Sequence, residues 1–189
     1  MYLATTEAAN ELLTHDPLAL LVGMLLDQQI PMEKAFTSPE VLRERLGGGA
    51  LDAHVIAGYD ADALEAIFRE PPALHRFPAA MAKRVQALAQ LLVDRYDGSA
   101  AAVWEGVRDG KELVARIGQL PGFGEQKAKI FAALLGKQFG VQPSGWRAAA
   151  GDYGTEGSLR SVADVVDADS LKQVRAFKKQ MKAAAKAGK

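Results

Sequence analysis

The sequence contains no cysteine, and this absence excludes disulfide bonds, thiol catalysis and thiolate metal sites. A long hydrophobic run is missing as well, because the longest apolar stretch, Leu18–Leu26, is far too short to cross a bilayer. The N-terminus has neither a basic region nor an uninterrupted apolar segment, so we expect no secretory signal and no membrane partner. The three histidines, His15, His54 and His75, lack the paired spacing of a metal site and are interpreted as structural or exposed.

The chain also lacks a net charge, since 23 basic residues balance 23 acidic ones. A protein with this balance has no overall attraction to nucleic acid. The distribution is uneven, however, because residues 1–169 carry 16 basic and 23 acidic side chains, whereas residues 170–189 carry seven basic and none acidic. The seven are Lys172, Arg175, Lys178, Lys179, Lys182, Lys186 and Lys189.

This basic segment predicts a helix over residues 170–187. Leu171, Val174, Phe177 and Met181 recur at three- and four-residue spacing, which is typical of an apolar stripe that docks on the body of a protein. The basic side chains then face solvent. They either complement the acidic body and the helix's own C-terminal dipole, or they attract the phosphates of a nucleic acid.

Apolar positions recur at helical spacing along the rest of the chain, and no segment shows the alternation of a strand. We therefore predict an all-α fold class, and 189 residues suffice for one large domain or two small ones. Thr5 or Thr6 is expected to cap a first helix, and Asp16 with Pro17 to open a second, almost wholly apolar one. Further helices are predicted over residues 39–46, 54–57, 60–68, 78–96, 145–150 and around a core Trp104.

The most distinctive stretch reads QLPGFGEQKAK and spans residues 119–129. A short apolar helix, Leu113–Ile117, leads into it, and a second helix is predicted to begin near Glu125. Gly122 and Gly124 permit backbone angles that a Cβ forbids, and they leave main-chain N–H groups accessible.

Such a turn suits a phosphate, because the second helix directs its unpaired N-terminal amides and positive dipole end toward the same place. Lys127 and Lys129 lie on the first turns of that helix, where they can approach neighbouring phosphates as point charges. The alternative is an ordinary corner between two helices, in which proline and glycine only end one element and begin the next.

Three polar residues, Asp27, Gln28 and Gln29, follow the apolar second helix just before Pro31. Polar groups at the end of a buried helix must be satisfied or serve a function. Capping with exposure to solvent and a role in binding both remain open here.

The LPGFG sequence followed by KA, together with LLDQQ at the end of the apolar helix, resembles the HhH-GPD superfamily of DNA glycosylases. The resemblance covers about residues 18–141. It implies two helical lobes with a DNA-binding cleft between them: residues 18–135, ending in the helix-hairpin-helix, and residues 1–17 plus 136–189. Some members carry a four-cysteine iron–sulfur cluster, which this cysteine-free chain cannot hold.

The resemblance also implies which residues meet DNA. Gln28 and Gln29 would approach the lesion, since in several relatives a glutamine there enters the space vacated by an extruded base. The residues implied to bind DNA at the hairpin are Gly122, Phe123, Gly124, Gln126, Lys127 and Lys129. Such hairpins commonly hold a monovalent cation, K⁺ or Na⁺, through carbonyls, here those of Gly118, Leu120 and Phe123; no other cofactor is expected.

The family pattern breaks at the catalytic aspartate, because its expected place holds Ser144-Gly145. The nearest acid downstream is Asp152, whose carboxylate could stabilise the positive charge that develops on the sugar when an N-glycosidic bond breaks. The alternative is that Asp152 belongs to a surface turn. Trp146, between these positions, either stacks on a base or serves as a packing plug.

Bifunctional relatives carry a nucleophilic lysine where this chain has Gln126. Lys127 stands one place farther on, rotated by about 100° around the helix. Strand cleavage by a lysine is therefore disfavoured. Met24 occupies the place of the catalytic glutamate found in adenine-removing relatives.

These observations lead to one expectation and two alternatives. We expect a monomeric, cytoplasmic base-excision repair protein, nucleoid-associated when bound to double-stranded DNA, that hydrolyses the N-glycosidic bond of an altered base. The first alternative is a non-catalytic DNA-binding module, because a fold does not imply a function. The second is a helical protein-interaction domain.

Overall fold

The structure is a computed structural model that describes residues 1–187, apart from the side chains of Lys182 and residues 185–187. Within these residues no strand forms, and the isolated bridge between Asp109 and Ser144 is the nearest approach to one. The predicted all-α class is confirmed. No helix in the described part of the chain combines the length and the apolar character needed to cross a membrane.

The chain divides by its internal contacts into two units. The first unit comprises Leu3–Glu105 and Gln119–Phe123, and the second comprises Met1–Tyr2, Gly106–Gly118 and Gly124–Lys189. The turn of the hairpin thus belongs to the first unit, and both hairpin helices belong to the second. The predicted lobes, residues 18–135 and residues 1–17 plus 136–189, stay a prediction.

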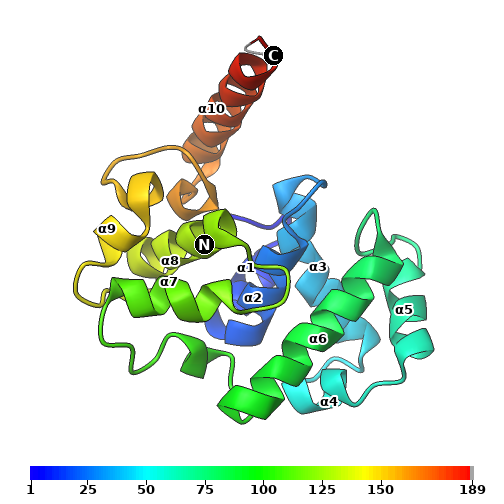
Figure 1. The fold of residues 1–189 in the computed structure, drawn as a ribbon. Coiled ribbons are helices and arrows are strands. Elements are labelled where there is room, and N and C mark those ends of the chain that lie inside the picture. The colour runs from blue at the N-terminus through cyan, green and yellow to red at the C-terminus, as the bar shows by residue number, and fades with distance from the viewer. Residues whose placement is uncertain (188–189) are drawn as a thin grey trace. The chain divides into compact units, whose positions relative to one another are not determined.

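The first unit consists of helices built around one apolar helix, α2 (Figure 1). Its elements are α1 (Glu7–His15), α2 (Pro17–Leu26), α3 (Met32–Arg45), α4 (Ala53–Ala57), α5 (Ala61–Arg69), α6 (Pro78–Tyr96) and the 3₁₀ turn η1 (Ala101–Val103). Thr6 caps α1, and the Asp16 carboxylate accepts the N–H groups of Leu18 and Ala19 at the start of α2, as predicted. Every residue of α2 from Leu18 to Leu26 is buried, because α1, α3 and α6 pack around it.

The start of α3 differs from the prediction. A helix was expected to begin at Pro39, but α3 already begins at Met32 and includes this proline. The hydroxyls of Thr37 and Ser38 donate to the carbonyls of Glu33 and Lys34 inside the helix. A buried proline is tolerated here because it also packs into the core, a tertiary effect that a local breaker rule does not include.

The predicted helix around Trp104 is also wrong. Only the single turn η1 forms. Gly106, two residues after the tryptophan, has a φ of +63°, which ends the right-handed helical conformation there. Val103 fills the core at this point, whereas Trp104 is only half-buried.

The second unit contains the two hairpin helices and the segments that wrap around them. Its elements are α7 (Gly110–Gly118), α8 (Glu125–Gln138), α9 (Trp146–Ala149), the 3₁₀ turns η2 (Gly151–Gly154) and η3 (Val162–Asp164), and α10 (Ala168–Ala187). α8 contacts α7, α9, η2 and η3, so it is the central element of this unit (Figure 1).

Trp146 packs the segment that follows α8 against the two hairpin helices, α7 and α8. Its side chain is 7% exposed, and a Cβ added at Gly136 of α8 would lie only 2.4 Å from its ring. A Cβ at Gly110 would lie 2.4 Å from the Trp146 Cα. Of the two roles considered for Trp146, the structure therefore supports packing.

The C-terminal helix α10 docks only partly. Val174 is buried and Leu171 and Phe177 are half-buried, but Met181 is 54% exposed. The stripe predicted over four residues is therefore wrong at its distal end, where α10 extends away from α8 and α9 (Figure 1). Three of the predicted basic side chains, Lys182, Lys186 and Lys189, lie outside the described ones.

Candidate nucleic-acid interface and cavity

The turn Gln119–Phe123 presents its backbone outward and its large side chains inward. Leu120 and Phe123 are buried, and the Phe123 N–H donates to the Leu120 carbonyl at 3.0 Å. Gly122 is exposed and has a φ of +83°, which a residue with a Cβ rarely adopts. Arg95 of α6 donates to the Gln119 side chain at 3.0 Å and thereby ties this turn to its unit.

The amino end of α8 is open. Gly124 is its N-cap residue, no side chain caps the helix, and among the described residues no neighbouring heavy atom lies within 4 Å of where a Cβ would stand. The first amides of a helix have no partner inside it, so this end can accept an anion. The predicted corner is therefore exposed at both glycines rather than buried against protein.

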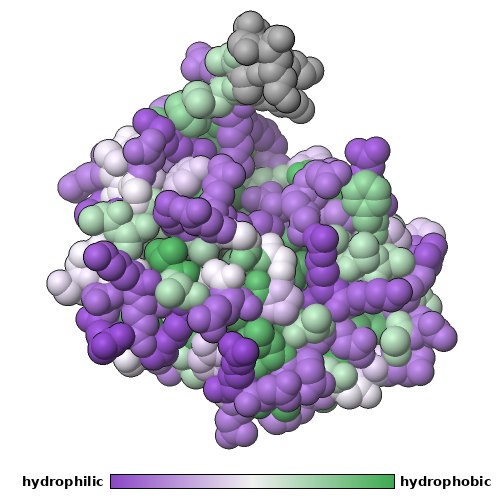
Figure 2. Space-filling model, in the orientation of Figure 1, coloured by the Kyte–Doolittle hydropathy of each residue, from purple (hydrophilic) through white to green (hydrophobic). Residues whose placement is uncertain are grey.

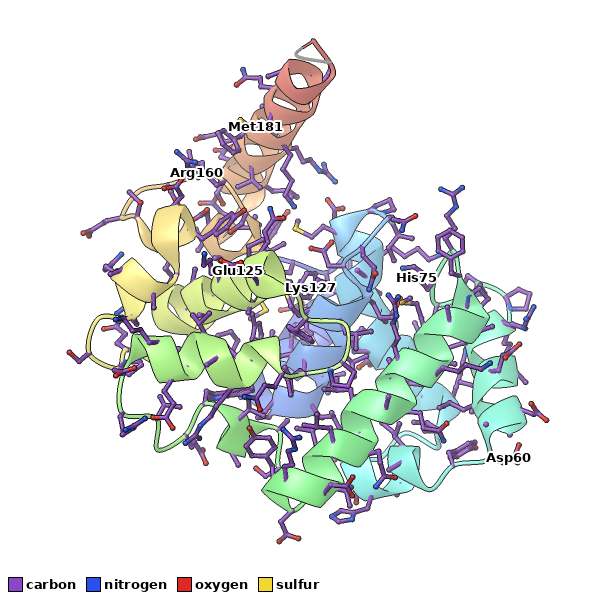
Figure 3. All side chains as sticks on the ribbon, viewed as in Figure 1. Asp60, His75, Glu125, Lys127, Arg160 and Met181 are labelled. Atoms are coloured by element: carbon purple, nitrogen blue, oxygen red, sulfur yellow. The ribbon has the colours of Figure 1, made fainter. Side chains whose placement is uncertain are left out.

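The predicted cations on α8 are less available than the sequence suggested. Lys129 Nζ donates to Glu125 at 2.6 Å, and this hydrogen bond lowers the pKa of the Glu125 carboxyl. Lys129 and Lys127 are both half-buried, and Figure 3 shows Lys127 with Glu125 on the first turn of α8. The ionised Glu125 disfavours an anion beside it, so main-chain N–H groups remain the principal donors at this end of the helix.

The other hairpin helix begins with a carboxylate held by two arginines. Glu112 accepts Arg108 Nε at 2.8 Å, the Arg108 N–H at 3.0 Å and Arg116 at 2.7 Å. These hydrogen bonds, the one from the Arg108 side chain first, lower the pKa of Glu112 to about 2. The charge therefore stays on Glu112 at neutral pH and fixes the segment that enters α7.

The two glutamines after α2 differ in their surroundings. Gln28 Nε2 donates to the Leu25 carbonyl at 2.7 Å, and Arg84 donates to Gln28 Oε1 at 2.9 Å. Gln29 is exposed and has a φ of +58°. The sequence predicted the same role for Gln28 and Gln29, but in the structure the Gln28 side chain is hydrogen-bonded to the protein and Gln29 is exposed.

A cavity of about 640 Å³ lies in the second unit beside α8. It is lined by Gln126, Lys129, Ile130, Ala150, Gly151, Asp152, Tyr153, Arg160, Phe177, Lys178 and Met181. Three of the residues predicted to form the site, Gln126, Lys129 and Asp152, therefore share one cavity. Gln126 Nε2 donates to the Tyr153 hydroxyl at 2.8 Å, which links α8 directly to η2.

Asp152 is held by an arginine that the sequence did not indicate. Arg160 donates to Asp152 Oδ2 at 2.9 Å, and its guanidinium lies 5.3 Å from the centre of the Phe177 ring of α10. Figure 3 shows Arg160 beside the first turns of α10 and Met181 farther along that helix. No local pattern could have identified Arg160, because it follows Asp152 by eight residues in an irregular segment.

Ser144, at the expected place of the family aspartate, lies elsewhere in the second unit. Its carbonyl accepts the Gly110 N–H at 2.9 Å at the start of α7, and it does not line the cavity. Gly145 is the left-handed residue that precedes α9. Ser144 and Gly145 therefore determine the course of the backbone between α8 and α9, and neither has a carboxylate.

Among the described residues no group of three or more His, Asp or Glu side chains is arranged to hold a metal ion. The predicted monovalent cation would use carbonyls instead, and the Leu120 carbonyl already accepts one N–H group. A carbonyl oxygen has two lone pairs, so Leu120 keeps one for a cation. The cation site at Gly118, Leu120 and Phe123 stays a prediction.

The comparison with protein families gives a match over most of the chain. The model of the HhH-GPD superfamily base excision DNA repair proteins matches residues 22–188 of this chain. The match continues past residue 141, where the resemblance described above ends, and includes the residues that line the cavity. Comparisons with curated proteins and with solved structures found no match.

Proposed function

The chain belongs to the HhH-GPD superfamily of base excision DNA repair proteins, and from this premise we propose that it hydrolyses the N-glycosidic bond of an altered base in duplex DNA. The observation that carries the proposal is the open amino end of α8, uncapped at Gly124 and with room for a ligand. Main-chain N–H groups at such an end bind a backbone phosphate without reading sequence. The same helix continues into the cavity, where Gln126 and Lys129 line one side.

We propose that the base enters this cavity and that Asp152 faces the sugar. In the reaction the bond from C1′ to the base nitrogen breaks, and its electron pair leaves with the base, which gains a proton. Water adds its oxygen to C1′ and loses a proton. The Asp152 carboxylate would stabilise the positive charge that develops on the sugar.

Strand cleavage through an amine is not part of the proposal. Gln126 takes the place of the lysine of bifunctional relatives, and an amide cannot form a Schiff base with the sugar. The Gln126 amide is instead hydrogen-bonded to Tyr153. We propose that this bond holds η2, and Asp152 with it, against α8.

One observation favours the alternative of a DNA-binding module without catalysis. The Asp152 side chain is 77% exposed and already paired with Arg160. Water screens the charge of such a carboxylate, and the arginine compensates it. Both effects weaken its stabilisation of a cation that develops nearby. The protein would then bind DNA through the hairpin and leave the base in place.

The test is base release from a panel of duplexes, each carrying one deaminated, alkylated or oxidised base. Abasic sites are scored by strand scission with alkali, and scission without alkali reports a lyase. We expect release from at least one duplex only when alkali is added, slowed about 100-fold or more in the Asp152→Asn variant.

The matched control is Asp169→Asn, another exposed aspartate in an ion pair, which does not line the cavity. It should retain the wild-type rate. Absence of release from every duplex, with DNA binding retained, would establish the non-catalytic module. DNA affinity that does not depend on salt concentration would instead support the protein-interaction domain.

A further inference from the structure

Gln28 is fixed by four hydrogen bonds within the first unit, one of them from its main-chain N–H to the Leu26 carbonyl at 2.7 Å. Its side-chain amide donates to Leu25 and accepts from Arg84, as described above. Its main-chain carbonyl lies 2.9 Å from Nε2 of His75, in the loop that precedes α6. A side chain with both ends of its amide engaged is a structural anchor, and its use by a ligand would require these bonds to break.

The surroundings of His75 determine the position of its proton. The ring is only 1% exposed, and its Nδ1 lies 3.0 Å from the main-chain N–H of Phe77. That N–H can only donate, so Nδ1 accepts and carries no proton. The proton is therefore on Nε2, which donates it to the Gln28 carbonyl. Figure 3 shows His75 beside the amino end of α6. Its two hydrogen bonds join Phe77, the N-cap residue of α6, to Gln28, which follows α2.

Gln29 is the opposite of its neighbour. It is exposed, and its φ of +58° lies in the left-handed region, which glycine, asparagine and aspartate adopt far more readily. A glutamine persists in this conformation only when the surrounding structure imposes it. The bonds that fix Gln28, immediately before it in the chain, provide that constraint.

We propose that His75 is a positioning residue that holds the Gln28 carbonyl and thereby presents Gln29, rather than Gln28, to the DNA bases. This inference rests on the proposed function. The amide of Gln29 both donates and accepts hydrogen bonds, so it suits the unpaired edge of a base whose partner has left the stack. Gln28 serves as the anchor for this arrangement.

Arg84 extends the arrangement to the hairpin turn. A Cβ added at Gly122 would lie 4.0 Å from Arg84 Cδ and 3.4 Å from Leu25 Cγ, so the turn rests on the residues that bind Gln28. All of them belong to the first unit. Gln29 and the turn Gln119–Phe123 are thereby joined by one connected group of contacts within the first unit.

Two variants of His75 separate the bonds of its two ring nitrogens. His75→Gln places an amide N–H near the position of Nε2, so it retains the donor to Gln28 and loses the acceptor for Phe77. His75→Asn places an oxygen near the position of Nδ1, so it retains the acceptor and cannot reach Gln28. A residue needed only for stability would respond similarly to both changes.

The first measurement is amide hydrogen exchange over residues 28–30 in the free protein. We expect His75→Asn to exchange about tenfold faster than wild type there, and His75→Gln to stay within about threefold. Equal exchange in wild type and His75→Asn would overturn the proposal. Equally raised exchange in both variants, with equal losses of melting temperature, would also overturn it.

The second measurement is the fluorescence of a 2-aminopurine base in a duplex at saturating protein, which rises when the base is unstacked. Gln29→Gly removes the side chain in a conformation that glycine prefers, so the fold is retained. We expect this variant and His75→Asn to lose the rise while their DNA dissociation constants change less than about threefold. A full rise with Gln29→Gly would overturn the assignment of Gln29. If wild type binds DNA without any rise, the proposed function fails, and the exchange measurement still decides the role of His75.

Discussion

The two glycines of the hairpin serve different purposes. Gly122 has a φ of +83°, so its lack of a side chain is required by the backbone. Gly124 has a φ of −80° and a ψ of 176°, an extended conformation that any residue adopts. Its lack of a side chain is therefore not needed for folding, and the open space around it leaves the amides of α8 accessible to a phosphate.

This distinction predicts the effect of Gly124→Val. The added side chain meets no described atom of the protein, so the fold should be retained, but it shields the first amides of α8 from a phosphate. We expect affinity for duplex DNA to fall about tenfold or more, equally for all sequences, because phosphate contacts carry no sequence information. Fluorescence anisotropy with two unrelated duplexes measures this.

Gly49→Val is the matched control for Gly124→Val. Gly49 is also exposed, and no described atom lies near the position of its Cβ. It lies in the loop after α3, far along the chain from the hairpin. Unchanged affinity of the Gly124 variant, or an equal loss in both variants, would contradict the phosphate site.

At the scale of elements, the segment after α9 depends on one buried ion pair. Lys137 of α8 donates to Asp164 Oδ1 at 2.5 Å, and only 14% and 2% of the two side chains are exposed. Asp164 also accepts the N–H groups of Arg160 and Ser161. The main chain at Arg160, whose side chain reaches Asp152, is therefore linked to α8 through Asp164.

We expect Lys137→Met to destabilise the protein by about 3 kcal/mol, because it leaves the Asp164 charge buried without its cation. The loss is measured by urea unfolding at neutral pH.

Lys172→Met is the control for this prediction. Lys172 pairs with Asp169 on α10, but 74% and 81% of these side chains are exposed. Its removal should cost less than about 0.5 kcal/mol. Equal losses in the two variants would mean that burial does not determine the strength of the Lys137 pair.

At the scale of the whole molecule, the charge is balanced in number but not in position. The surface drawn in Figure 2 is mostly hydrophilic, and α10 carries the exposed basic residues Lys172, Arg175, Lys178 and Lys179. Lys178 also lines the cavity beside Asp152. A basic helix at the edge of a candidate site favours attraction to the DNA backbone over mere complementation of an acidic body.

This placement predicts a salt effect. Replacement of the four basic residues by glutamine should reduce the slope of log affinity against log salt concentration by about 1 to 2, since one face of the helix supplies at most two phosphate contacts. Exchanging each lysine for arginine and Arg175 for lysine preserves the charge and should preserve the slope. An unchanged slope in the glutamine variant would show that α10 only faces solvent.

Most of the fold was predictable because its signals are local. The caps at Thr6 and Asp16, the periodicity of α6 and the glycines of the hairpin each act within a few residues, so the sequence alone identifies them. The predictions failed at Pro39 and Trp104, where the packing of a helix against distant segments decides its length. The prediction also failed at Met181, because the apolar stripe of α10 continues beyond the part of this helix that packs on the rest of the unit.

The candidate site divides in the same way. The sequence by itself determined the hairpin and its two glycines, because these depend on residue type and spacing along a short stretch. Only the tertiary structure brought Arg160 and Phe177 to Asp152, and only it distinguished the anchored Gln28 from the exposed Gln29. Contacts between residues far apart in sequence depend on how whole helices pack, and no local pattern of side chains records that packing.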